Sequence, residues 1–243
     1  MVERSPEKAG VGGSIPSLAT IFNDLRVVSN LYSYVENSPL NKADADGLTI
    51  QCDGDKSRCQ KDLAKLAPGT KVDSNGTVQK ASLIHRLLNH LTGHGGGTAL
   101  VTRLVNNHDV THVTPDASEH AGHQTPGYVF YNPNGVSGVL VRGQDGQLVA
   151  GPTSGVDVLG HELIHQDHLE RGIQDDSIVD HVFDKDNKKY REEGKEEEFR
   201  TVGFRPFAKR GDTTENQLRK EMGEPQRATY DNNPAHFTEV LPH

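Results

Sequence analysis

Hydrophobic and polar positions divide this chain into short segments, each with its own periodicity. A weak helical pattern covers residues 57–66, and a stronger one in residues 81–93 predicts a helix that ends at Gly93. The segment His-Gly-Gly-Gly after it, residues 94–97, is typical of a flexible loop. Two apolar runs within residues 98–114 fit either a pair of strands or a helix followed by a strand.

The next part of the chain is predicted to contain strands. Residues 115–126 are polar and indicate a loop, whereas residues 128–131 and 138–142 surround an Asn-Pro-Asn-Gly turn and together predict a hairpin. Residues 147–150 suggest one more strand. These last strands are candidates for a sheet edge that binds a peptide as an added strand, or they simply cover the helix that follows them.

Helical patterns return in the C-terminal half. Residues 153–171 have an apolar side and a cap at Thr153 or Ser154, and shorter helices are predicted at 196–204 and after Thr213 or Thr214. The charged residues 172–197 indicate a solvated loop or exposed helix. The predicted fold class is α+β, with a small twisted, mostly antiparallel sheet, a helix beneath it and a helical C-terminal half.

Composition limits the classes of partner and location. The net charge of −8 argues against nucleic acid or an anionic membrane as the main partner. No apolar run approaches about 18 residues, so no membrane insertion is expected. The N-terminus lacks the apolar region of a signal peptide, so export would use another route or a longer chain. Cys52 and Cys59 fit a disulfide and two free thiols about equally.

The sequence Gly-His-Glu-Leu-Ile-His at residues 160–165 carries the clearest chemistry. On a helix, His161 and His165 project from one face and can bind one Zn²⁺, while Glu162 can act as general base on a zinc-bound water. With 13 histidines in 243 residues, such a motif arises by chance in about one case in twenty, so its helical context matters. Arg171 stands where a metzincin needs its third histidine, which excludes that class.

A catalytic zinc site needs a third protein ligand, and the candidates lie downstream. The acidic residues of the short helix at 196–204 are the best placed, although they also continue a charged run that is typical of a solvated surface. Glu215, on the following predicted helix, is the alternative ligand.

Two motifs together resemble known metalloproteases. The pair His-Glu-Leu-Ile-His and Glu-Glu-x-Arg-Thr-x-Gly is similar to the active site of clostridial neurotoxin light chains and of NleD/HopH-type effector metalloproteases. The resemblance implies Glu198 as third ligand, Glu197 as its support or substitute, and Thr201 as a residue that orients a ligating histidine. It also implies that Arg227 and Tyr230, an Arg-x-x-Tyr element, stabilise the oxyanion.

A second resemblance concerns the N-terminal part. Residues 32–48 look like the end of the core of Rhs/YD-repeat proteins, except that Ala45 replaces the usual proline. This implies a boundary segment at 1–48, a zinc metallopeptidase domain at 49–243, and an accompanying immunity protein. Autoproteolytic cleavage at the boundary is in doubt because of Ala45.

These observations predict a zinc-dependent, gluzincin-like endopeptidase with a zincin-like fold. This hydrolase is expected to be a secreted bacterial toxin or effector that a specialised secretion system delivers into a target cell. There it would cleave a host or bacterial protein. The alternative is a non-enzymatic secreted module in which the same ligands form a structural zinc site.

Overall fold

The computed structural model describes residues 50–107, 109–143 and 145–241. The predicted Rhs-like boundary segment, residues 1–48, lies outside the described residues. None of the described helices has the length and hydropathy of a membrane-spanning segment.

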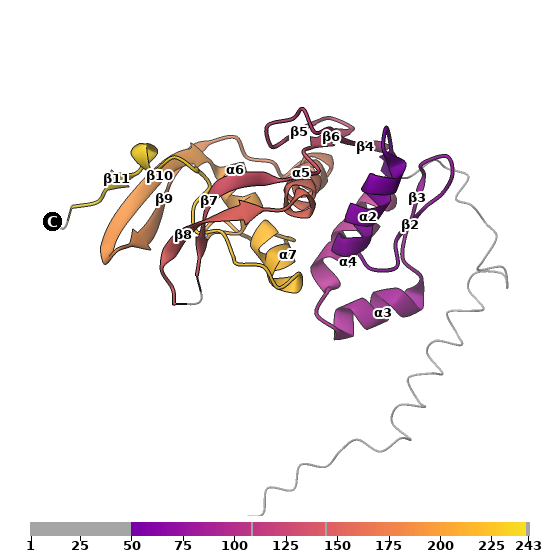
Figure 1. The fold of residues 1–243 in the computed structure, drawn as a ribbon, viewed down its shortest axis with the longest axis horizontal. Coiled ribbons are helices and arrows are strands. Elements are labelled where there is room, and N and C mark those ends of the chain that lie inside the picture. Colours follow the sequence, from indigo (N-terminus) through magenta and orange to yellow (C-terminus); the bar gives the residue numbers. More distant parts are fainter. Residues whose placement is uncertain (1–49, 108, 144, 242–243) are drawn as a thin grey trace, which may run out of the picture. The chain divides into compact units, whose positions relative to one another are not determined.

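The sheet nearest the predicted metal helix has four strands in the order β1-β4-β6-β5 (Figure 1). These strands are β1 (Ile50–Cys52), β4 (Thr111–Pro115), β6 (Tyr128–Tyr131) and β5 (Gly122–Thr125). The pairs β1–β4 and β4–β6 are parallel, and β5 is antiparallel to β6. The α+β class is confirmed, but the expected mostly antiparallel arrangement is wrong for this sheet. Parallel neighbours need a long crossover, which here is the helical region between β1 and β4.

Three helices form that crossover: α2 (Lys56–Leu66), α3 (Leu83–Leu91) and α4 (Gly95–Val105). A two-stranded ribbon of β2 (Lys71–Val72) and β3 (Val78–Gln79) lies between α2 and α3. The glycines predicted as a flexible loop instead begin α4. A Cβ at Gly97 would lie 1.9 Å from the carbonyl oxygen of Leu66, so the absent side chain permits close packing of α4 on α2. Cys52 and Cys59 form a disulfide, which decides between the two alternatives.

Helix α5 (Gly155–Glu170) is the centre of the molecule. Ser154 and Asp157 form a capping box at its start. It packs against β5 and β6 and against α2, α4, α6 and α7. Leu159, Leu163 and Ile164 are fully buried in the main core. Because neighbours surround the helix, every residue from Gly155 to His168 is buried, including the polar ones, so its environment is not that of a surface helix with one apolar side.

The predicted hairpin between residues 128 and 142 is wrong. Strand β6 pairs with β4 and β5, whereas β7 (Val136–Arg142) pairs with β8 (Leu148–Thr153) in a separate two-stranded sheet. The turn after β6 therefore passes the chain from one sheet to another, which a local turn sequence does not reveal.

Residues 172–197 also differ from the prediction of a solvated loop or exposed helix. They contain a long hairpin of β9 (Ile178–Lys185) and β10 (Lys188–Lys195), to which β11 (Thr238–Glu239) adds a third strand after the 3-10 turn η1 (Pro234–His236). Asp186 and Asn187 form its turn with positive φ angles of 53° and 62°. The buried His181 and Phe183 alternate with the exposed Asp180, Val182 and Asp184, a strand pattern that the high charge density concealed.

Two predicted helices near the C-terminus are confirmed. Helix α6 (Glu196–Val202) ends at Gly203 in a left-handed conformation with φ of 99°, and α7 (Glu215–Glu221) has Thr214 as its cap. Phe199, Phe204 and Phe207 form a second small core beneath the β9–β10 hairpin. Figure 1 shows this C-terminal part on one side of α5 and helices α2 to α4 on the other.

Candidate active site

Helix α5 carries the predicted motif into the interior. His161 and His165 lie one turn apart with their ring centroids 4.6 Å from each other, and their residues are 9% and 6% exposed. Their Nε2 atoms are 3.0 Å apart. The fixed spacing of a helix therefore brings two imidazole nitrogens to one point.

Helix α6 brings a carboxylate to the same point. Oε2 of Glu198 lies 3.2 Å from Nε2 of His161 and 3.0 Å from Nε2 of His165. These three residues form a group whose ligand atoms could hold one metal ion. Ligands about 2.0–2.1 Å from a tetrahedral zinc ion lie roughly 3.3 Å from one another, close to the separations found here.

The outer nitrogen of each ring contacts another carboxylate. Nδ1 of His161 is 2.9 Å from Oε2 of Glu215, and Nδ1 of His165 is 2.9 Å from Oε1 of Glu197. If each Nδ1–H donates to its carboxylate, both Nε2 atoms present lone pairs beside Glu198. Three acceptor atoms within 3.2 Å of one another repel unless a cation lies between them, so this donor set fits zinc.

The shifted pKa values of His165, Glu198 and Glu197 also indicate that this group of side chains favours a positive charge. Burial lowers the pKa of His165, but its hydrogen bonds with Glu197 and Glu198 outweigh this and raise it to about 10. Burial raises the pKa of Glu198, whereas the two histidines lower it far below its usual range. Burial raises the pKa of Glu197 as well, but His165 and His168 lower it to about 2.

Glu197 contacts His165 on the side of the ring that faces away from Glu198. Its Oε1 lies 2.9 Å from Nδ1 of His165, 2.8 Å from Nδ1 of His168 and 3.1 Å from the hydroxyl of Thr201. Thr201 donates to Glu197 and its hydroxyl is also 3.4 Å from Nδ1 of His165. Glu197 and Thr201 are therefore placed to orient His165, and Glu198 is the carboxylate placed among the Nε2 atoms.

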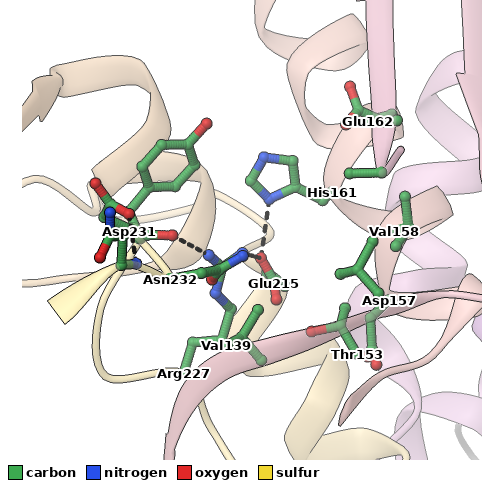
Figure 2. Close-up of a pocket in the computed structure, with 15 residues that line it drawn as sticks. Val139, Thr153, Asp157, Val158, His161, Glu162, Glu215, Arg227, Asp231 and Asn232 are labelled. Carbon is green, nitrogen blue, oxygen red and sulfur yellow. Dashed lines mark hydrogen bonds and ion pairs between the residues drawn. The ribbon is translucent and has the colours of Figure 1, made fainter. Parts of the chain in front are cut away.

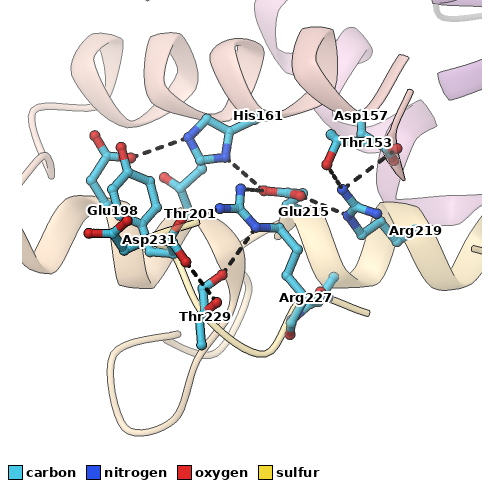
Figure 3. A network of polar contacts seen from close by, with 12 residues as sticks. Thr153, Asp157, His161, Glu198, Thr201, Glu215, Arg219, Arg227, Thr229 and Asp231 are labelled. Atoms are coloured by element: carbon cyan, nitrogen blue, oxygen red, sulfur yellow. Dashed lines mark hydrogen bonds and ion pairs between the residues drawn. The ribbon is translucent and has the colours of Figure 1, made fainter. Parts of the chain in front are cut away.

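Glu215 links His161 to two arginines (Figure 3). Besides His161, it accepts hydrogen bonds from Nε of Arg219 at 2.7 Å and from Nη1 of Arg227 at 3.1 Å. Burial raises its pKa, but Arg227 and His161 lower it well below the ordinary value. Glu215 contacts the Nδ1 side of His161, away from Glu198, so the geometry places it as an orienting group.

A cleft of about 600 Å³ opens beside these residues. Figure 2 shows His161 and Glu162 on its helical wall and Arg227 on the facing wall. Glu162 is 7% exposed, and burial raises the pKa of its carboxyl while the neighbouring histidines lower it. A carboxylate beside both a cleft and a candidate metal centre is suited to accept a proton.

The strand that lies over Glu162 is β5. A Cβ at Gly122 would be 2.8 Å from both Cγ and Oε1 of Glu162, so the backbone of this strand lies directly against the side chain. Because β5 is the last strand of its sheet, it offers the edge nearest the motif. Strands shortly before residue 151 are the predicted candidates for this edge, and Val136 and Val139 of β7 do line the cleft, but the strand whose backbone lies against Glu162 is β5, from the segment predicted as a polar loop.

Arg227 and Tyr230 both line the cleft. The ring of Tyr230 stacks near His161 with a centroid separation of 6.3 Å, and burial followed by the Glu198 carboxylate raises the pKa of its phenol. Arg227 donates to Glu215 and to the backbone carbonyls of Thr229 and Tyr230. The structure thus brings all the predicted site residues into one region, with Arg227 held by Glu215.

Comparison with known proteins adds an independent finding. The model of the peptidase M91 family, described as an effector protein, matches residues 56–230. The chain belongs to this family. The matched range makes it a peptidase-type effector with a protein substrate, and it contains every predicted site residue. Neither the curated proteins nor the solved structures gave a match.

Three residues of this peptidase site were not predicted. Gly122 lies in the segment taken as a loop, and its closeness to Glu162 depends on strand pairing. Arg219 and His168, both fully buried, were also not among the predicted site residues. The spacing Glu215–Arg219, one helical turn, and His165–His168 were the available local signals.

Proposed function

We propose that this effector peptidase is a zinc-dependent endopeptidase. The observation that carries the proposal is the convergence of Nε2 of His161, Nε2 of His165 and Oε2 of Glu198 within 3.2 Å, while Glu215 and Glu197 engage the outer ring nitrogens. His161, His165 and Glu198 would hold the ion. When bound, zinc supplies a Lewis acid for the scissile carbonyl and lowers the pKa of a coordinated water to about 7.

The chain's own groups supply the remaining chemistry. Glu162 accepts a proton from the attacking water and then delivers it to the leaving amine. The phenol of Tyr230 donates a hydrogen bond to the oxyanion that develops on the carbonyl. Arg227 keeps N–H groups beyond those used by Glu215 and the loop carbonyls, and its positive charge on the cleft wall favours the same oxyanion.

The substrate is proposed to bind as an extended peptide. Strand β5 ends its sheet and passes over Glu162, so a peptide added to that edge would bring a peptide bond to the histidine side of the cleft. The cleft next to it is open enough to receive side chains, which favours an enzyme over a closed structural zinc site.

The setting of the reaction follows from the effector family. We propose that the protein is delivered into a target cell and cleaves a protein there. The gluzincin-like subclass, the toxin role and an immunity partner rest on the sequence resemblances.

The general base is tested by Glu162→Gln. The amide keeps the size of the side chain but cannot accept the proton, so we expect kcat on a cleavable protein or peptide library to fall by at least about 100-fold. Zinc content, measured by atomic absorption, should stay at the parent level. Undiminished proteolysis in this variant would refute the mechanism.

The metal ligand is tested by Glu198→Ala, with Glu196→Ala as the matched control. Both remove a carboxylate from the first turn of α6, but that of Glu196 forms an ion pair with Lys209, at 3.6 Å, and does not belong to the group of candidate ligands. We expect zinc affinity to drop with Glu198→Ala and to remain unchanged with Glu196→Ala. A zinc-binding parent without peptidase activity, in which Glu162→Gln changes nothing, would favour the structural-zinc alternative.

A further inference from the structure

Helix α3 turns its apolar side outward. Its five large aliphatic residues are between 50% and 72% exposed, namely Leu83, Ile84, Leu87, Leu88 and Leu91. Their spacing places them in one stripe along the helix. We call this stripe the α3 apolar face. Most amphipathic helices bury such a face, and large exposed apolar patches mark interaction sites.

The polar side of α3 fixes this orientation. Asn89 is buried, and its Nδ2 donates to the carbonyl of Pro68 at 2.7 Å and to the hydroxyl of Thr98 at 2.8 Å. Ser82 caps the helix, and the ring of His85 lies against Gly69. Rotating the helix to bury its leucines would leave the amide of Asn89 unpaired, at a cost. The apolar face is therefore held outward by specific contacts.

The charge around this face differs from that of the whole chain. The chain has a net charge of −8, yet residues 74–108 contain no aspartate or glutamate. The helix itself carries His85, Arg86 and His90, and the exposed Lys80 lies just before it. The carboxylate that reaches the start of α4, from Glu221, accepts hydrogen bonds from the amides of Gly96 and Gly97.

We propose that α3 docks the protein onto an anionic lipid bilayer. The helix would lie in the interface, with the α3 apolar face among the acyl chains and the basic residues near the headgroups. This is peripheral binding, consistent with the absence of a spanning helix among the described residues. Figure 1 shows α3 at the periphery of the helical part, remote from the β9–β10 hairpin.

The size of the face favours a bilayer over a second copy of the chain. A helix of nine residues is about 13.5 Å long, so its face covers far less than the roughly 800 Å² per partner of a stable protein interface. A bilayer imposes no such minimum, because binding grows with the apolar area inserted and with charge attraction. Five exposed aliphatic side chains beside the cations Lys80 and Arg86 meet both conditions.

The test is vesicle co-sedimentation of the full chain. The parent is compared with Ile84→Ser/Leu87→Ser and with the control Ile178→Ser/Val182→Ser, which removes residues that are 62% and 51% exposed on β9. Vesicles contain phosphatidylcholine alone or with phosphatidylserine. We expect binding to the anionic vesicles that falls at high salt, is reduced about tenfold or more by the α3 substitutions, and is unchanged in the control.

Two results would overturn this proposal. One is equal vesicle binding by the parent and the α3 variant while circular dichroism shows both folded. The other is no vesicle binding by the parent, whether the chain stays monomeric or forms an oligomer that the α3 substitutions dissolve. Peptidase activity is not a readout here, so the proposal stands or falls separately from the proposed function.

Discussion

In both His161 and His165, each of the two ring nitrogens lies against a carboxylate. Their Nδ1 atoms face Glu215 and Glu197, and their Nε2 atoms face Glu198. A carboxylate behind a ligating imidazole fixes its tautomer and strengthens it as a ligand. In the proposed zinc site, the affinity for metal would therefore depend on residues from three helices, and not on the motif of α5 alone.

At the same scale, Gly122→Ala should reduce activity without removing the metal. The new Cβ would lie 2.8 Å from Oε1 of Glu162 and 2.9 Å from Cγ1 of Val158, so the side chain of the proposed general base must move. We expect kcat/KM to fall by about tenfold or more, because small displacements of catalytic groups are costly. Zinc content should remain at the parent level.

Thr125→Ala is the control, since Thr125 is exposed in the same strand. It should leave kcat/KM and zinc content unchanged. If Gly122→Ala has full activity, β5 does not constrain Glu162, and the proposed substrate edge loses its main support.

At the scale of elements, a buried arginine joins α7 to the centre of the fold. Arg219 is fully buried and donates to Glu215 at 2.7 Å and to the hydroxyl of Thr153, at the end of β8, at 2.8 Å. Removing Arg219 takes the closest positive charge from the buried carboxylate of Glu215, which keeps Arg227 and His161, and leaves the buried hydroxyl of Thr153 without its donor. We expect Arg219→Met to lower the free energy of unfolding by about 3–5 kcal/mol, as measured by urea denaturation.

Lys220→Met provides the matched control for that experiment. Lys220 is the next residue on α7 and is exposed, so the same change in charge and shape should alter stability by less than about 0.5 kcal/mol. Equal stability of the two variants would mean that Arg219 does not hold α7 in place.

The elements that the sequence predicted are those with local signals. Ser154 and Thr214 are helix caps, Gly203 ends α6, and α5 lies where its motif predicts a helix. The pairing of strands was not predictable in this way. The turn after Tyr131 looked like that of a hairpin, but β6 finds parallel and antiparallel partners in other segments. Strand β5 has a polar sequence without a strand pattern, so it can be identified only from its pairing with β6.

At the scale of the whole molecule, the site combines segments far apart in the chain. The motif at 161–165 could be identified from its spacing, whereas the choice of Glu198 over Glu197 and Glu215 needed the resemblance to metalloproteases. The structure distinguishes the three carboxylates by which ring nitrogen each one faces. That information lies in the packing of α6 and α7 on α5, which no single segment encodes.

The same packing predicts how the molecule responds to metal removal. Without a cation, the acceptor atoms of His161, His165 and Glu198 repel one another or must take up a proton in a buried site. Zinc that binds only the folded state stabilises it by about 2.7 kcal/mol when its free concentration is 100 times Kd. For a unit of this size, treatment with a chelator should therefore lower Tm by about 5–10 °C.

Added zinc should restore Tm and magnesium should not, since magnesium prefers oxygen ligands. Differential scanning calorimetry should show the same shift for Glu162→Gln and none for Glu198→Ala. If neither the chelator nor added zinc changes the Tm of the parent protein, the proposal of a metal centre is contradicted, whatever the activity of the protein.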